Sequence, residues 1–436
     1  MGRLHGALAA AVGIAAISGG RAAADSLVDA GQLRAAGYTK YWETQLPLRR
    51  GDQVAAVHLL DDNIYVTTTD GEVLAVHPGA GLLRWGRHIT QRTYTIFRPT
   101  HVVDEADAGP VVFTTSSGIT VIDRYSGELR KVTPSMFAAG SAATGEVTRL
   151  IEGDSEILQY RLFAGSSDGH LYAVEWKVPA QPEPTRLWRA RTGGAVRSTP
   201  VYGDADHLYC ASMGGRVYCC TSATKAEQWT FPPKGTIGPV RGDIHVTQDG
   251  VYVASADRSV YKLDPISGIQ RWRRRLPEML ETGPVVLAGT VFQYCPGAGV
   301  FAIDAGYGDI LWDLPEGQQA VARHGERICI TMTDNHLAWV DVKTGKVNSK
   351  VSLPDRTLAA QNHDDAAIYL ISPLGNLMCA RPVGVKPLTN VELEVAHATL
   401  NQPPPKGDSA PETAESPPEP DDDASTRPPA EDEEQQ

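Results

Sequence analysis

The stretch Gly299–Trp312, which reads GVFAIDAGYGDILW, contains the pattern that decides the fold. An alternating apolar run leads to Asp304, Gly308 follows four residues later, and Trp312 stands four residues after that glycine. Alternation with a period of two is typical of a strand with one buried face, and a glycine between two such runs marks a turn. The stretch therefore predicts two antiparallel strands, the second of which carries a tryptophan.

The same pattern recurs along most of the chain. The place of Asp304, which we call the slot position, is taken in chain order by His77, Asp123, Glu175, Thr221, Asp264, Asp304, Asp341 and Arg381. Successive slot positions lie 37 to 52 residues apart. A period of about 40–50 residues with four short strands per unit is typical of a β-propeller. Helical repeats of similar length are disfavoured, because the runs alternate and are rich in Val, Ile, Tyr and Thr.

The residues that recur at fixed distances from the slot position are expected to be structural. They are the tryptophans Trp42, Trp85, Trp188, Trp229, Trp272 and Trp312, the glycines Gly81, Gly127, Gly268, Gly308 and Gly345, and the slot aspartates Asp123, Asp264, Asp304 and Asp341. The third copy departs from the pattern, since a Pro-rich segment interrupts it before Trp188.

Eight hairpins of second and third strands can be counted, so the sequence predicts an all-β, eight-bladed propeller of four-stranded antiparallel blades over residues 41–390. The eighth copy has no outer strand of its own. The segment Tyr41–Pro47 resembles the outer strands of the other copies, and we expect it to join the blade that contains Leu377. An N-terminal strand around Trp42 would then close the ring and pair edges that would otherwise invite aggregation.

The N-terminus has the three-part layout of a secretory signal peptide over residues 1–24. Arg3 supplies positive charge, Ala7–Ile17 is apolar, and Ala22–Ala24 offers small residues for cleavage. The apolar run is too short to span a bilayer as a helix. A mobile Ala-rich terminus is the alternative. Because no cysteine precedes Cys210, no lipid anchor is expected. We expect an exported protein, periplasmic or secreted, with residues 25–40 leading into the propeller.

The C-terminal segment, residues 391–436, is expected to be a disordered tail. From Asn401 on it contains nine prolines, eleven acidic residues and two basic ones, so it carries −9 of the formal net charge of −12. Such a composition cannot bury enough apolar area to offset the entropy of the backbone. The segment would either keep the protein soluble or dock a basic partner. The acidic total argues against nucleic-acid binding.

The spacing Asp-x-x-x-Gly-x-x-x-Trp resembles the tryptophan-docking repeat of the pyrroloquinoline-quinone-like (PQQ-like) propeller superfamily. The resemblance covers residues 41–385, and four of the eight tryptophans occupy one repeat position. It implies that the tryptophan packs between neighbouring blades and that the glycine permits a tight turn. The superfamily includes quinoprotein dehydrogenases, which hold a quinone and Ca²⁺ over the central channel, and non-enzymatic propellers of the outer-membrane assembly factor (BamB) type.

This chain looks closest to the non-enzymatic kind, which implies a binding or scaffolding protein of the cell envelope that meets a protein partner through its loops. Few residues lie beyond the repeats, and no quinone-site motif can be matched, so we expect no cofactor, no metal and no catalysis. The chain differs from the assembly factors in lacking a lipid-attachment cysteine and in its acidic tail. A quinone-dependent dehydrogenase and a sensor of a small ligand in the channel stay open as alternatives. A monomer is expected.

Three further groups could carry chemistry. The six cysteines include Cys210 and Cys219, which could face each other across a hairpin, and the vicinal pair Cys219–Cys220; small buried residues are the favoured interpretation. The basic cluster Arg271, Arg273, Arg274 and Arg275 lies on an expected outer strand, where charge discourages edge pairing. It could instead dock an acidic partner, including the tail. Asp204 and Asp257 could bind a cation near the channel.

Overall fold

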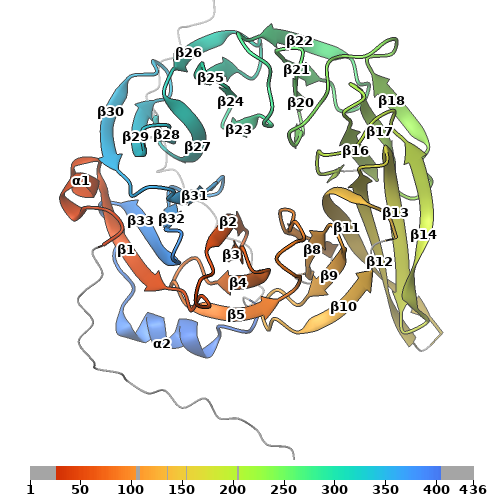
Figure 1. Cartoon of the computed structure of the whole chain (residues 1–436), viewed down its shortest axis with the longest axis horizontal. Helices are drawn as coiled ribbons and strands as arrows, with labels where there is room; N and C mark the ends of the chain where they lie inside the picture. Colours follow the sequence, from red (N-terminus) through yellow and green to blue (C-terminus); the bar gives the residue numbers. More distant parts are fainter. Residues whose placement is uncertain (1–25, 105–108, 135, 154, 204–205, 404–436) are drawn as a thin grey trace, which may run out of the picture.

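The protein is a closed ring of eight β-sheets, which we call blades 1 to 8 in chain order (Figure 1). The computed structural model describes residues 26–104, 109–134, 136–153, 155–203 and 206–403. Each blade has four antiparallel strands, which follow one another from the centre of the ring to its rim, and the sheet of blade 3 contains one additional short strand. The predicted eight-bladed propeller of four-stranded blades is confirmed.

Blades 1 to 4 take up the first half of the ring. Blade 1 contains β2 (Val54–Leu60), β3 (Asn63–Thr68), β4 (Glu72–Val76) and β5 (Leu83–His88). Blade 2 contains β6 (Thr100–His101), β8 (Val111–Thr115), β9 (Gly118–Ile122) and β10 (Leu129–Pro134). Blade 3 contains β11 (Ala139–Glu152), β12 (Ser155–Ser166), β13 (His170–Val178) and β14 (Gln181–Arg191), and β7 (Val103–Asp104) pairs with β11 in parallel. Blade 4 contains β15 (Val201–Tyr202), β16 (His207–Ala211), β17 (Val217–Thr221) and β18 (Glu227–Phe231).

Blades 5 to 8 complete it. Blade 5 contains β19 (His245–Thr247), β20 (Gly250–Ser255), β21 (Ser259–Leu263) and β22 (Gln270–Arg275). Blade 6 contains β23 (Val285–Leu287), β24 (Thr290–Cys295), β25 (Gly299–Asp304) and β26 (Ile310–Leu314). Blade 7 contains β27 (Gly317–His324), β28 (Arg327–Met332), β29 (His336–Asp341) and β30 (Val347–Ser352). Blade 8 contains β31 (Leu358–Ala360), β32 (Ile368–Ile371), β33 (Asn376–Pro382) and, from the N-terminus, β1 (Tyr38–Gln45).

The ring is closed by the N-terminal strand, as the sequence predicted. Strand β1 is the outer strand of blade 8 and pairs antiparallel with β33, with Trp42 opposite Cys379 and Thr44 opposite Leu377. The three inner strands of blade 8 come from the C-terminal end of the propeller, and its outer strand comes from the N-terminal end. The hydrogen bonds between β1 and β33 therefore close the ring.

The hydrophobic core lies between blades rather than in one central body. Each of its clusters joins the facing surfaces of neighbouring sheets; one, for example, combines Phe292 and Trp312 of blade 6 with Ile328 and Val340 of blade 7. The second and third strands are buried on both sides, as β3 and β20 are along their whole length. The fold therefore depends on how well each blade fits the next.

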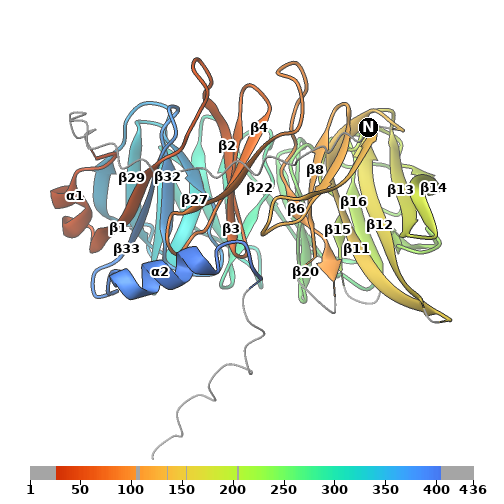
Figure 2. The same cartoon turned by 90° about the horizontal axis from the view of Figure 1, so that it is seen from below.

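Blade 3 differs from its neighbours in length. The Pro-rich segment that was expected to interrupt the third copy is part of the long strand β14, which pairs with β13 after a turn at residues 179–180. Its prolines lie at the outer edge of the sheet, where the backbone needs no donor on the solvent side. The hairpins of blade 3 extend beyond the body of the ring (Figure 2).

Two helices flank blade 8. Helix α1 (Ala30–Ala35) precedes β1, which begins at Tyr38, so part of the expected lead of residues 25–40 belongs to the folded ring. Helix α2 (Asn390–Ala398) begins with a capping box at Thr389, whose side chain and Glu392 satisfy each other's backbone N–H groups. The expectation that disorder begins at residue 391 was therefore wrong. The helix could not be predicted from the composition of the segment, because none of its residues is buried and its capping box depends on only two residues, Thr389 and Glu392.

Helix α2 lies outside the rim of the ring, beside blades 8 and 1 (Figures 1 and 2). The segment that follows it is held where the guanidinium of Arg84 donates to the backbone oxygen of Leu400. The expected signal peptide and most of the acidic tail lie outside the described residues. Neither helix, nor any other helix in the described ranges, is long and apolar enough to cross a bilayer.

Candidate functional site

The repeat tryptophans join each blade to the next. In all six cases the indole N–H donates to the backbone oxygen that directly follows the slot residue of the next blade, as in Trp272 to Ala305 at 3.1 Å and Trp312 to Val342 at 2.7 Å. The other four pairs are Trp42 with Pro78, Trp85 with Arg124, Trp188 with Ser222 and Trp229 with Pro265. Each contact combines the burial of a large aromatic side chain with a satisfied polar atom.

The repeat glycines receive these rings. Gly81, Gly127, Gly268, Gly308 and Gly345 all have a φ of +68° to +77°, and a Cβ on any of them would lie 2.4 to 2.7 Å from a ring atom of the preceding blade's tryptophan. Two reasons thus favour glycine here: the left-handed backbone and the close approach of the indole. In blade 4 the same turn position is Lys225, with a φ of 56°.

The slot aspartates fix the turns under the tryptophans. Asp123, Asp264, Asp304 and Asp341 each accept backbone N–H groups two or three residues ahead, which is the Asx-turn arrangement. At Asp264, the Ser267 N–H and the Arg271 guanidinium favour the charged form and lower the carboxyl pKa to about 2. These residues act on the turn and stand apart from any cavity opening.

Two joints lack the tryptophan and use other contacts. Between blades 2 and 3 the position holds Lys131, whose ammonium lies 3.1 Å from the carboxylate of Glu183. Between blades 7 and 8, Tyr38 of β1 packs against Trp339 of β29 with ring centroids 5.2 Å apart. Leu33 of α1 belongs to the same cluster of buried side chains, so the N-terminal helix and strand substitute for the absent indole.

All six cysteines are buried and free, which confirms their interpretation as small core residues. The expectation that Cys210 faces Cys219 was wrong: Cys210 pairs with Tyr218, and Cys219 with Tyr209. Cys219 and Cys220 point to opposite faces of β17 because successive strand residues alternate. Burial raises the pKa of Cys219 to about 12 and that of Cys220 to about 11, which keeps both thiols protonated.

The basic cluster on β22 is largely neutralised by the protein itself. Arg271 pairs with Asp264, Arg273 with Asp257 at 3.1 Å, and Arg274 with Asp309 at 2.7 Å, the last across the joint to blade 6. Arg275 at the end of the strand is exposed. Three of the four arginines thus hold the turns of blades 5 and 6 instead of presenting free charge.

Of the two carboxylates proposed for a cation, the structure describes only Asp257. Asp257 sits in the turn between β20 and β21, where it accepts from Tyr261 and Arg273, and Asp204 lies outside the described residues. Within the described ranges, no group of three His, Cys, Asp or Glu side chains is arranged to hold a metal ion.

An exposed apolar surface lies at the rim of blades 5 and 6. We call it the blade 5–6 rim; it comprises Ile266, Ile269, Tyr307, Ile310 and Leu311 in the last turns and outer strands of these blades. Tyr307 is 83% exposed, Ile266 78% and Ile269 62%. The sequence analysis missed this surface, although a comparison with blade 7 was available, where Lys343, Thr344 and Lys346 stand at the positions of Ile266, Tyr307 and Ile269.

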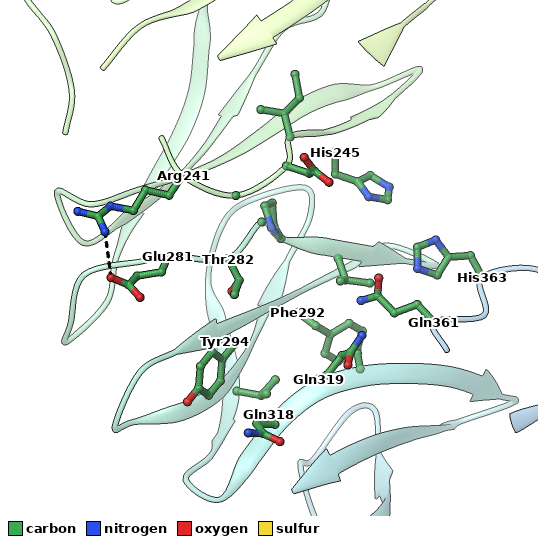
Figure 3. Close-up of a pocket in the computed structure, with 18 of the residues that line it drawn as sticks. Arg241, His245, Glu281, Thr282, Phe292, Tyr294, Gln318, Gln319, Gln361 and His363 are labelled. Carbon is green, nitrogen blue, oxygen red and sulfur yellow. Dashed lines mark hydrogen bonds and ion pairs between the residues drawn. The ribbon is translucent and has the colours of Figure 1, made fainter. Parts of the chain in front are cut away.

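The central channel contains a cavity that several blades line together. It measures about 740 Å³ and is lined by residues from the inner strands and adjoining loops of blades 2, 5, 6, 7 and 8. Figure 3 shows His245 of blade 5 opposite His363 of blade 8, with Gln319 and Gln361 nearby and the Arg241–Glu281 ion pair of 3.3 Å at the far side. A cavity of this size can enclose a small molecule. Sequence reasoning missed its residues, because the inner strands are short and carry no repeat signature.

Comparisons with known proteins agree with this architecture. The family model of the outer membrane protein assembly factor BamB matches residues 9–231 and 236–368. Among solved structures, BamB from Moraxella catarrhalis is similar with a TM-score of 0.58 and 17% identity, covering 80% of this chain and 99% of that one. The computationally designed Ika8 protein is similar with a TM-score of 0.57 and 14% identity, covering 77% and 98%. No curated protein matches the sequence. By the extent of the family match, the chain belongs to the BamB family of PQQ-like propellers.

Proposed function

We propose that this protein is a non-enzymatic scaffold of the cell envelope that binds a protein partner through the blade 5–6 rim. The observation that carries the proposal is the exposure of Ile266, Ile269 and Tyr307 in turns that do not need apolar residues. Large apolar side chains that are exposed together on neighbouring blades are candidates for an interaction surface.

The repeat provides an internal comparison. Counted from the slot position, Ile266 and Ile269 of blade 5 correspond to Lys343 and Lys346 of blade 7. Both turns have the same backbone, with the aspartate accepting from two N–H groups and a glycine at positive φ. The fold therefore accepts lysine at these positions, so the isoleucines of blade 5 serve something other than turn formation.

Charge at the rim supports recognition by apolar contact. Arg271 and Arg274, which border the exposed side chains, are paired with Asp264 and Asp309. A partner would therefore meet a surface whose apolar residues are free and whose charges are already balanced. Aromatic and aliphatic anchors of this kind supply most of the binding energy of protein interfaces.

The envelope location rests on family membership and on the expected signal peptide of residues 1–24. A monomeric ring would present one rim per molecule to its partner. A family name does not fix the partner, because function depends on the surface rather than on the fold.

The test is co-purification after cross-linking in cells that express the protein natively. We expect the unaltered protein to recover one discrete partner. The double variant Ile266→Lys with Ile269→Lys, which copies blade 7, should lose it. The matched control, Lys343→Ser with Lys346→Ser, changes the same turn positions in blade 7 and should retain it. Unchanged recovery by the lysine variant of blade 5 would refute the proposal.

A separate experiment tests the absence of catalysis. Purified protein is mixed with pyrroloquinoline quinone and Ca²⁺, and dye reduction is followed with alcohols and sugars as substrates. We expect neither turnover nor a tight complex with the quinone. Turnover would overturn the scaffold proposal and restore the dehydrogenase alternative.

A further inference from the structure

The central channel contains one arginine around which three cavities meet. Arg98 and Asp243 line all three cavities, which measure about 740, 390 and 250 Å³. Residues of blades 1, 2, 5, 7 and 8 line the cavity of 390 Å³. This cavity therefore lies where the inner strands of opposite blades converge. A side chain that borders all three is placed near the axis of the ring.

Arg98 is held in this place by the backbone. Ile96 forms a β-bridge with Thr115, and the Phe97 N–H donates to the Thr114 oxygen at 2.9 Å, so this segment extends the inner edge of blade 2 ahead of β6. The Arg98 side chain is exposed, and no ion pair or hydrogen bond of its guanidinium is found among the described residues. A guanidinium has five N–H donors, which makes it a ready receptor for an oxyanion.

Three histidines lie within electrostatic reach of this guanidinium. They are His58 of β2, His245 of β19 and His363 after β31. The pKa of each is lowered mainly because burial removes water from the imidazole, and the positive charge of Arg98 lowers it further. The pKa is about 4 for His58 and for His245, where the nearby His363 also lowers it. At neutral pH these imidazoles are uncharged, and each can donate one hydrogen bond.

The other titratable and charged groups near the channel have the following contacts. Asp243 accepts the Thr199 N–H at 2.7 Å, and Arg241 is paired with Glu281 at 3.3 Å. His101, which shares the smallest cavity, is bound through Nδ1 to Asp61 at 2.6 Å and through Nε2 to Tyr65 at 2.9 Å. Asp364, next to His363, acts against the lowering of that pKa. Asp243 borders the same three cavities as Arg98, and among the described residues no ion pair is found for either side chain.

We propose that the channel binds a small multivalent oxyanion, with Arg98 as the charged receptor and His58, His245 and His363 as hydrogen-bond donors around it. The amides of Gln319 and Gln361 line the same space and can donate further bonds. Carboxylate and phosphate ligands share this chemistry. None of these residues belongs to the blade 5–6 rim. The proposed anion site can therefore be tested independently of the proposed function.

Binding of an anion here is coupled to protonation. An anion on Arg98 cancels the field that lowers the histidine pKa values and favours the imidazolium forms. The anion and the proton therefore help each other to bind, and by linkage the affinity rises as the pH falls. We expect binding to become about tenfold tighter between pH 7.5 and pH 5.5, which corresponds to a net uptake of roughly half a proton for each anion bound.

The test uses sulfate, because its charge is constant over this range, in isothermal titration calorimetry, with the histidine resonances followed by NMR. Arg98→Ala should weaken sulfate binding at least tenfold, whereas the control Arg92→Ala, an exposed arginine of the same loop, should leave it unchanged. In the absence of sulfate, Arg98→Ala should also raise the pKa values of His58, His245 and His363. The histidine pKa values thus show, without any ligand, whether the charge of Arg98 lies close to the three imidazoles.

Two further arms separate the outcomes. Citrate and inorganic phosphate distinguish a site for carboxylates from one for phosphates. A thermal melt shows whether Arg98→Ala is folded, as an exposed side chain predicts. Equal sulfate affinity in the unaltered protein and in Arg98→Ala, or histidine pKa values that do not respond to this substitution, would overturn the proposal.

Discussion

Replacing Gly308 by alanine is expected to weaken the joint between blades 5 and 6. Its φ of +77° costs an alanine about 1–2 kcal/mol. The added Cβ would lie 2.7 Å from Cδ2 of Trp272, a ring that the joint holds by its bond to Ala305. Forcing such a contact costs a further 1–3 kcal/mol or so. The expected loss in the free energy of unfolding is therefore about 2–5 kcal/mol.

Gly289 of the same blade is the matched control. Its φ is +80°, and nothing lies within 4 Å of a Cβ built there, so Gly289→Ala carries the backbone cost alone. Urea unfolding of both variants, followed by tryptophan fluorescence, gives the two losses, and their difference of about 1–3 kcal/mol measures the docking of the indole. Equal losses would show that the glycine is required only for its backbone and that the ring can move aside freely.

Further predictions concern closure, turns and thiols. Trp42→Ala removes the indole that joins blade 8 to blade 1 and should lower the free energy of unfolding by about 3 kcal/mol, with faster proteolysis of the N-terminal strand as the sign of an opened ring. Because the folded pKa of Asp264 lies below its ordinary value, its carboxylate stabilises the fold above about pH 4, and the advantage over Asp264→Asn should shrink as the pH falls towards 2; a constant difference would argue against stabilisation by the charge of Asp264. Cys219, with its pKa raised to about 12, should react with thiol reagents only after unfolding, and rapid labelling of the native protein would contradict its burial.

The repeat could be predicted from the sequence because the contacts between neighbouring blades use tryptophan, a rare residue, and glycine at a fixed spacing. A tryptophan such as Trp312 and a glycine such as Gly345 recur where one blade meets the next, and their contacts are local to each pair of blades. The ring closure by Trp42 followed from counting outer strands. By contrast, helix α2 was not predicted. The capping box at Thr389 and the bond from Arg84 to the backbone oxygen of Leu400 stabilise this region, and neither can be recognised from the composition of the segment.

The candidate surfaces were less accessible to sequence reasoning. His58, Arg98 and His245 come from blades 1, 2 and 5, and only the closed ring brings the third of them to the same space as the first two. The basic cluster at Arg273 was visible as a run of charge, but its pairing with Asp257 depends on how the hairpin folds back. Residues that act together through ring geometry have no fixed spacing from which they could be predicted.

The most direct test of the scaffold account is site-specific photo-cross-linking in cells that express the protein natively. A photoreactive residue replaces Tyr307 of blade 6 in one variant and Thr344, the equivalent turn position of blade 7, in another. The account predicts one discrete protein adduct from position 307 and none from position 344. Equal adducts from both positions, or no adduct from position 307, would contradict the claim that the blade 5–6 rim binds the partner.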